Sequence, residues 1–300
     1  MESTDTKVFP GCCHPTRILR PDDRCFSLIG SARGEKEVLH VRLQQACGGR
    51  HRCWCGNRIR HREGFHEAGA RLALNDFREP ALQRSLARLG TPDRVFGQIV
   101  DVRRADEVHR FFEGAERALG PVTVAIANAG IYPNTPVLEM TQEEWDRVME
   151  TNLRGVFLTC QAAARRMVAK DIPGKIITIS SGAYQSGRPG AAHYCASKAG
   201  VVLFTKVLAL ELAKYRINVN CIAPGFIQVE GEVSPLTEEY VSTLTRQIPW
   251  GRAGIPQDIA NGALFLVSPL AEFMTGDVIS INGGTSAGRA YLPLSTPKRT

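Results

Sequence analysis

The stretch SGAYQSGRPGAAHYCASK, residues 181–198, stands between a predicted buried strand and a predicted helix. The strand is the apolar run 175–181, which ends in Ser181. The helix carries apolar residues at helical spacing over residues 196–215. Ligands of parallel α/β sheets bind at the carboxyl ends of strands, so the stretch has the position of an active site.

Tyr194 and Lys198 are four residues apart and therefore share one face of the predicted helix. A fixed ammonium about 4 Å from a phenol is worth roughly 4 kcal/mol at an effective dielectric of about 20, which is about three pKa units. We therefore predict that Lys198 lowers the pKa of Tyr194 into the range of general acid and base catalysis. Ser181 would hydrogen-bond the substrate oxygen that Tyr194 protonates. Alone, however, a Tyr and a Lys at this spacing are usually a solvated pair.

Further motifs in the chain support the catalytic interpretation. Asn128-Ala-Gly130 closes an apolar run, Asn152-x-x-Gly155 lies in a helical run, and Asn220-Cys-Ile-Ala-Pro-Gly225 follows another apolar run. With Ser181 and Tyr194-x-x-x-Lys198, these motifs resemble the short-chain dehydrogenase/reductase family in the family's own order, over about residues 64–284. The resemblance implies an α/β fold with a doubly wound, Rossmann-like parallel sheet. It also implies hydride transfer between a nicotinamide and a carbonyl or secondary alcohol.

The resemblance also implies roles for individual residues. Tyr194 would be the acid/base, Lys198 would lower its pKa and bind the nicotinamide ribose, and Ser181 would orient the substrate oxygen. Asn152 would link Lys198 through water to solvent. The implied cofactor contacts, besides Tyr194 and Lys198, follow strand ends: Asp76, Asp101, Val102, Asn128, Gly130, Pro224, Gly225 and Ile227. Family members commonly carry a threonine where this chain has Val229, which puts that cofactor contact in doubt.

Asp76 indicates which dinucleotide the chain would prefer. It closes the predicted strand 71–74, which would be the second strand of the sheet. An acidic residue there accepts hydrogen bonds from the adenosine ribose and repels a 2′-phosphate, so NAD is expected over NADP. The alternative is that Asp76 caps the following helix, residues 80–89.

The overall charge does not indicate a nucleic-acid partner. The formal net charge is +7, but residues 1–62 hold 12 Lys and Arg against 6 Asp and Glu, which leaves 25 against 24 elsewhere. No apolar run approaches membrane-spanning length, and the first residues lack an apolar signal core, so we expect a cytoplasmic protein. The expected partners are a small alcohol or ketone and further copies of the chain, as a dimer or tetramer. Neither a membrane nor a nucleic acid is expected.

The segment before Gly64 does not fit the family. The G-x-x-x-G-x-G turn that holds the pyrophosphate is absent, and CGGRHRCWCGNRIRHRE, residues 47–63, stands in its place. Three interpretations remain open: a zinc-binding insertion, a basic surface segment, and a reading-frame slip. The zinc ligands would be Cys47, His51, Cys53, Cys55 and His61, which lack the usual C-x-x-C spacing, and no metal site is predicted.

The frame slip can be tested against the genetic code. Read one base later, the codons allowed for residues 49–62 permit V-I-V-A-G-A-G-T-G-(F/S)-G-I, an apolar strand followed by the missing glycine turn. As written, the chain is expected to lack its first strand and its pyrophosphate site, and to leave a strand edge unpaired. The alternative function is thus an inactive homologue that cannot hold a dinucleotide.

Three regions follow from these interpretations. Residues 1–62 form a poorly ordered basic segment, residues 63–284 a single catalytic domain, and residues 285–300 a loose tail. His193, Tyr184, Gln185 and Ser186 are expected to shape the substrate pocket, under a lid over residues 230–250. The lone His193 fits packing as well as recognition. Polyols, sugars, steroids and oxoacyl thioesters all remain open as substrates.

Overall fold

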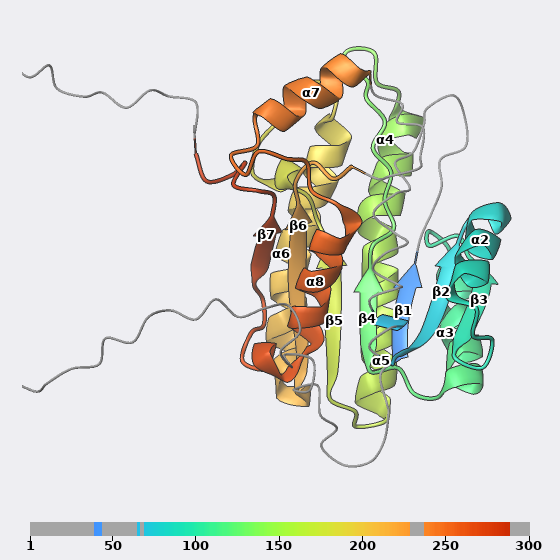
Figure 1. Cartoon of the computed structure of the whole chain (residues 1–300). Helices are drawn as coiled ribbons and strands as arrows, with labels where there is room; N and C mark the ends of the chain where they lie inside the picture. The colour runs from blue at the N-terminus through green and yellow to red at the C-terminus, as the bar shows by residue number, and fades with distance from the viewer. Residues whose placement is uncertain (1–38, 44–64, 67–68, 229–236, 289–300) are drawn as a thin grey trace, which may run out of the picture. The chain divides into compact units, whose positions relative to one another are not determined.

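A computed structural model describes residues 39–43, 65–66, 69–228 and 237–288 of the chain, all within one compact unit. Seven parallel strands form one sheet in the order β3-β2-β1-β4-β5-β6-β7 (Figure 1). The order reverses direction between β1 and β4, which makes the sheet doubly wound and creates a switch point there. The predicted fold class is therefore confirmed.

The strands run Leu39–Leu43 (β1), Arg71–Asp76 (β2), Val95–Ile99 (β3), Val124–Ala127 (β4), Gly174–Ile179 (β5), Ile217–Pro224 (β6) and Val278–Ile281 (β7). The longer helices run Glu79–Leu89 (α2), Ala105–Leu119 (α3), Gln142–Met149 (α4), Gly155–Ala169 (α5), Ala192–Leu212 (α6), Glu238–Arg246 (α7) and Pro256–Val267 (α8). No helix in these described ranges is both long and apolar enough to cross a bilayer.

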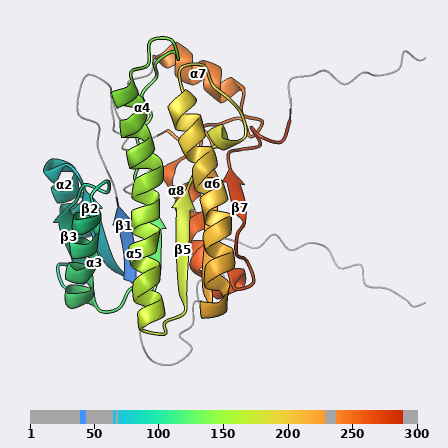
Figure 2. The same ribbon diagram turned by 180° about the vertical axis from the view of Figure 1, so that it is seen from behind.

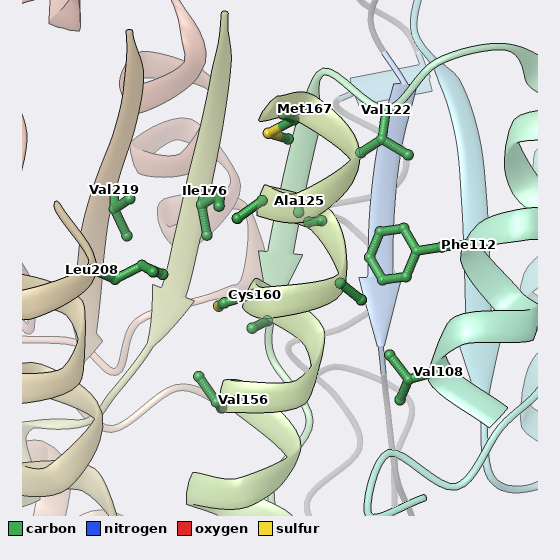
Figure 3. Packing of buried hydrophobic residues seen from close by; sticks show 14 of the residues in the cluster. Val108, Phe112, Val122, Ala125, Val156, Cys160, Met167, Ile176, Leu208 and Val219 are labelled. Carbon is green, nitrogen blue, oxygen red and sulfur yellow. The ribbon is translucent and has the colours of Figure 1, made fainter. Parts of the chain in front are cut away.

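Two apolar cores lie on the two faces of the sheet, because successive residues of a strand point to opposite faces. Figure 2 shows the face of the sheet that α3, α5 and α6 cover. There Ala125 and Ile176 pack with buried residues of these three helices (Figure 3). On the other face, Val124 and Ile177 pack with buried residues of α2 and α8. Because both faces are covered, β4 in the middle of the sheet is a continuous apolar run, as expected for a buried parallel strand.

The expectation that the first strand is missing is wrong. β1 lies between β2 and β4, with His40 opposite Leu72 on one side and Val124 on the other. Its sequence LHVRL lies upstream of the Cys/His/Arg-rich segment, whereas we expected no strand before Gly64. A short run with alternating apolar residues suffices because the backbone hydrogen bonds of two neighbouring strands are available to it. β2 and β4 are therefore both paired on this side.

Two helices differ from the sequence-based prediction near the candidate site. α6 begins at Ala192, so Tyr194 lies in its first turn. The helical run that carries Asn152-x-x-Gly155 is divided by a π-helical turn, Glu150–Arg154, between α4 and α5. π-turns widen a helix locally and are frequent at functional sites.

Candidate active site

The polar residues predicted from the sequence gather at one edge of the sheet. Since all seven strands are parallel, their carboxyl ends share this edge, toward which the arrows of Figure 1 point. The residues at or just after these ends are Asp76 (β2), Asp101 (β3), Asn128 (β4), Ser181 (β5) and Pro224 (β6). The N-terminal turn of α6 brings Tyr194 to the same edge, beside Ser181.

Asn152 lies in the π-turn and is fully buried, so it is not the surface residue that a mid-helix asparagine usually is. Its Oδ1 accepts a hydrogen bond from Ile131 N at 2.7 Å, and its Nδ2 donates to Ile131 O at 2.8 Å. Nδ2 also lies 3.2 Å from Ser197 Oγ, on α6. The amide thus joins the loop after β4 to the helix that carries Tyr194.

The Asn152-x-x-Gly155 motif has a packing reason. A Cβ added to Gly155 would lie 2.7 Å from Cγ2 of Val102, so only glycine lets the π-turn approach the end of β3 this closely. Val102 is fully buried at that contact. In the structure, Val102 therefore supports the wall of the site through packing.

Lys198 is also buried and lies next to Asn152. Its Nζ donates a hydrogen bond to Ile179 O at 2.9 Å, and Ser180 Oγ donates to Lys198 O at 2.8 Å. A Cβ added to Gly130 would lie 3.4 Å from Asn152 Oδ1 and 3.5 Å from Lys198 Nζ. The glycine of Asn128-Ala-Gly130 therefore gives the ammonium and the amide room to meet.

Tyr194 is half-buried, and its titration differs from the sequence-based prediction. Burial raises the pKa of the phenol above its ordinary value of 10, and a hydrogen bond with Ser181 and the positive charge of Arg188 offset this only in part. The Lys198 ammonium lies 5.8 Å from the centre of the ring and is bound to Ile179 O. The predicted lowering by Lys198 is therefore not found, and Tyr194 carries its proton at neutral pH.

Two residues near Tyr194 were missed by sequence reasoning. The ring of Tyr132 lies edge-to-face with the ring of Tyr194, with centroids 5.8 Å apart. Arg188 lowers the pKa of Tyr194 from an exposed loop six residues upstream. Tyr132 follows Asn128-Ala-Gly130 by two positions and Arg188 lies inside the quoted stretch, so their positions in the chain were the available signal.

The residues expected to shape the pocket divide into two groups. Tyr184, Gln185 and Ser186 lie on the short segment after β5, where the Gln185 side chain donates a hydrogen bond to the Tyr184 hydroxyl. His193 is fully buried and its Nε2 lies 3.0 Å from Oε1 of Glu144, so it packs beneath the site. Of the two roles left open for His193, the structure favours packing.

Asp76 offers a place for a ribose. Its Oδ1 accepts a hydrogen bond from Arg78 N at 3.0 Å. Arg78 is itself the N-cap of α2, and no side chain caps that helix, so Asp76 does not have the capping role considered above. Its Oδ2 is buried and receives no hydrogen bond from the residues that the structure describes. A buried carboxylate oxygen without a donor is costly, and two ribose hydroxyls would satisfy it. The residues present thus fit a dinucleotide at this strand end.

Unlike Asp76, Asp101 has protein partners for its carboxylate. Its carboxylate forms a two-point ion pair with the guanidinium of Arg103, at 3.0 Å from Nε and 2.7 Å from Nη2. Its backbone N–H donates to Oε2 of Glu107 at 2.7 Å. A contact between Asp101 and an adenine would therefore have to share the carboxylate with Arg103.

The turn after β6 is shaped by close packing. A Cβ added to Gly225 would lie 2.7 Å from Cβ of Asn282, so a side chain cannot be accommodated there. The Ile227 side chain is buried against Gly254, which leaves only its backbone to face a ligand. Pro224 closes β6 and is buried.

Several sequence-based predictions fall outside the described residues. These are the proposed zinc ligands Cys47, His51, Cys53, Cys55 and His61, the segment 47–63 that replaces the glycine turn, the substitution Val229, and the first part of the lid. The second part of the lid contains α7, which begins with Thr237 Oγ1 accepting a hydrogen bond from Tyr240 N.

Comparison with known proteins places this geometry in a family. A family model described as enoyl-(acyl carrier protein) reductase matches residues 62–286. The chain is 36% identical to 3-oxoacyl-(acyl-carrier-protein) reductase FabG of Chlamydia muridarum over 222 residues, which is 73% of this chain and 89% of that protein. It is 41% identical to the FabG of Staphylococcus aureus over 184 residues, 61% of this chain and 74% of that protein.

A solved structure agrees with the sequence matches. The crystal structure of a short-chain type dehydrogenase/reductase from Mycobacterium marinum is 33% identical, with a TM-score of 0.72, and the match covers 84% of this chain and 96% of that one. The family predicted from the motifs is thus confirmed. The chain belongs to the short-chain dehydrogenase/reductases, oxidoreductases that act on alcohol and carbonyl groups with a nicotinamide cofactor.

Proposed function

We propose that this chain transfers hydride between NAD and a carbonyl or secondary alcohol, with Tyr194 as the proton donor and acceptor. The observation that carries the proposal is the convergence of Tyr194, Ser181, Lys198 and Asn152 at the carboxyl edge of the sheet. The supporting contacts come from β4, β5, the π-turn and α6, which are far apart in sequence.

Each side chain has a distinct role in the proposed reaction. Tyr194 holds its proton at neutral pH and donates it to the substrate oxygen, which the Ser181 hydroxyl orients. Lys198 places a buried positive charge near the phenol, and Asn152 fixes the backbone at Ile131 beside that charge. When bound, the nicotinamide supplies or accepts the hydride.

NAD is proposed over NADP on the strength of Asp76. Its buried, undonated Oδ2 suits the hydroxyls of an unmodified ribose, and its negative charge opposes a 2′-phosphate. Asp101 and Val102 would lie toward the adenine, and Asn128, Gly130, Pro224, Gly225 and Ile227 toward the nicotinamide end. Lys198 would bind the nicotinamide ribose.

The relatives supply a first substrate class. FabG proteins are named as 3-oxoacyl-(acyl-carrier-protein) reductases, so a 3-oxoacyl thioester is the carbonyl compound to test first. Reduction of a ketone also agrees with a Tyr194 that begins the reaction protonated. The alternative, an inactive homologue, predicts neither dinucleotide binding nor turnover of the thioester in the same assay.

The chain is further proposed to act as a homo-oligomer. α6 is apolar on both sides: one side packs on the sheet, while Leu203, Val207 and Leu210 form an exposed stripe at helical spacing. Phe157 on α5 lies edge-to-face with Phe204 of α6 next to this stripe. A second copy burying this stripe would explain it, and Leu203→Glu would then give a monomer in sedimentation velocity.

The decisive experiment is titration of the purified full chain with NAD+ and NADP+ by calorimetry, with thermal unfolding followed in parallel. Tight NAD+ binding, weaker NADP+ binding and NADH oxidation with a 3-oxoacyl thioester are expected. Failure to bind either dinucleotide would favour the inactive homologue. Equal or tighter binding of NADP+ would retain the oxidoreductase and overturn the preference assigned to Asp76.

A further inference from the structure

A chain of two hydrogen bonds runs from α4 to the backbone of Tyr194. Oε1 of Glu144 lies 3.0 Å from Nε2 of His193, and Nδ1 of His193 lies 2.8 Å from the amide nitrogen of Tyr194. His193 is 0% exposed, and the side chain of Glu144 is 13% exposed. The pair is thus largely shielded from water.

The geometry fixes the protonation of the imidazole. A backbone amide can only donate, so Nδ1 of His193 must accept and carries no proton. Nε2 then carries the ring proton and donates it to the Glu144 carboxylate. His193 is therefore neutral, in the Nε2–H tautomer.

The hydrogen bond from Tyr194 N meets a need at the start of α6. The first N–H groups of a helix have no partner within the helix, and an N-cap side chain usually accepts from one of them. Here the N-cap is Ala191, which has no acceptor, and the first intrahelical bond runs from Cys195 N to Ala191 O. His193 supplies the acceptor instead, at the residue whose phenol faces the substrate.

We propose that Glu144 and His193 act as a positioning pair that holds Tyr194 for proton transfer and releases it when His193 becomes protonated. The proposal rests on the function proposed above for Tyr194. Neither residue touches the substrate. They act through the backbone amide of Tyr194 and the tautomer that this amide requires.

Protonation of His193 would place an N–H at Nδ1 against the N–H of Tyr194. Within the pair the charged partner of the ring is Glu144, and Arg147 of α4 acts on that carboxylate. Lys198 of α6 and Arg188 on the loop before α6 lie near the adjoining Tyr194 side chain. Burial of Glu144 opposes its ionisation, but hydrogen bonds from Thr135 and His193 hold its pKa below the ordinary value. The ionised Glu144 favours the imidazolium, whereas the Tyr194 amide disfavours it. Protonation of the ring therefore keeps the contact with Glu144 and breaks the contact with the Tyr194 amide.

Matched substitutions separate positioning from packing. His193→Leu keeps the volume and removes the acceptor, and we expect kcat to fall at least about tenfold with KM little changed, since small displacements of a reacting group have large costs. His193→Asn restores an acceptor near the Nδ1 position and cannot titrate. It is expected to recover most of kcat and to abolish the loss of carbonyl reduction at acid pH.

Glu144→Gln keeps the acceptor for Nε2 but removes the charge that favours the imidazolium. Its acid limb is expected at lower pH than that of the wild type, with kcat at neutral pH retained. Glu143→Gln, at the exposed neighbouring position, and His109→Leu, on α3, are the controls and should leave both parameters unchanged.

A measurement without turnover distinguishes failure of this inference from failure of the proposed function. Imidazole 15N shifts of the full chain should show His193 as the Nε2–H tautomer at neutral pH, and the Tyr194 amide should exchange slowly in the wild type and fast in His193→Leu. This result would stand even if no substrate were turned over. A cationic or Nδ1–H His193 at neutral pH, or unchanged kcat in His193→Leu of an active chain, would overturn the proposal.

Discussion

On the two sides of the switch point between β1 and β4, buried polar groups differ in whether they have hydrogen-bond partners within the protein. On the β4 to β6 side, the amide of Asn152, the ammonium of Lys198 and the ring of His193 each have protein partners at hydrogen-bonding distance. On the β2 to β3 side, Asp76 keeps one buried carboxylate oxygen without a donor in the described residues. These three groups are satisfied within the protein, whereas Asp76 keeps an acceptor available to a ligand.

This difference indicates which buried groups contribute to folding stability and which are available for ligand binding. Satisfied buried networks stabilise the fold and fix a geometry, whereas an unsatisfied buried group costs stability until a ligand supplies the missing hydrogen bond. Substitutions that remove a partner from these buried hydrogen bonds, such as Asn152→Ala, should therefore lower the free energy of unfolding. Substitutions at Asp76 should affect cofactor affinity and leave unfolding of the free protein little changed.

The largest effect is expected for Tyr194→Phe. The ring and its edge-to-face contact with Tyr132 are kept, while the hydroxyl that exchanges the proton is lost. General acid and base catalysis is worth about 10²–10⁴-fold, so kcat should fall by that factor while the melting temperature stays close to that of the wild type. Steady-state kinetics and thermal unfolding together check this. Turnover within about threefold of the wild type would remove Tyr194 from the reaction, because general catalysis contributes far more than that.

The next largest effect is expected where the buried hydrogen bonds of Asn152 are removed. Asn152→Ala leaves both Ile131 N–H and Ile131 C=O buried without their side-chain partner. Each such group costs about 1–3 kcal/mol, so the free energy of unfolding should drop by about 2–4 kcal/mol in denaturant titrations. Asn261→Ala, at an exposed position on α8, is the control and should change it by less than about 0.5 kcal/mol. Equal losses in the two variants would contradict a buried network at Asn152.

The same comparison explains which features the sequence predicts. Tyr194 and Lys198 are four residues apart on one helix, so their proximity follows from local structure. Asn152 lies on a different helical segment, and its role beside them was implied only by the family resemblance. β1 could not be predicted, because LHVRL is short and is separated by a long segment from β2. Its place depends on hydrogen bonds from β2 and β4, which are long-range. The pairing of His193 with Glu144 depends in the same way on the packing of α4 against α6.

The titration of Tyr194 shows a second limit of sequence reasoning. Helical spacing correctly puts Lys198 near the phenol, but it gives neither the burial of the ring nor the direction of the ammonium. In the structure the ammonium binds Ile179 O, and burial dominates the pKa of Tyr194. The magnitude of a charge interaction depends on these three-dimensional details.

A smaller effect, on dinucleotide affinity, is expected at Asp76. Asp76→Asn keeps an oxygen for the bond from Arg78 N and removes the negative charge. A charge-assisted hydrogen bond is worth about 1.5 kcal/mol or more, so NAD+ should bind about tenfold more weakly, while NADP+ should bind more tightly as the repulsion is lost. Calorimetry with both dinucleotides measures this, and unfolding of the free protein should be unaffected. An equal loss of affinity for NAD+ and NADP+ would indicate that Asp76 stabilises the end of β2 and does not distinguish the two riboses.

The smallest effect concerns the pH dependence of the two reaction directions. Because burial raises the pKa of Tyr194 above 10, the proton-donating form persists through pH 9, and carbonyl reduction should not lose rate there through deprotonation of this phenol. Alcohol oxidation needs the deprotonated form, so its rate should still be rising with pH across the same range.

Arg188→Gln removes a charge that lowers the pKa of Tyr194, so the rise in oxidation rate should move to more alkaline pH while the rate of reduction is unchanged. Arg117→Gln, exposed on α3, is the matched control. If the rate of oxidation instead levelled off below pH 9 in the wild type, the pKa of Tyr194 would be below 9 in the working enzyme. Bound cofactor would then have to bring the Lys198 ammonium closer to the phenol than it lies in the free protein.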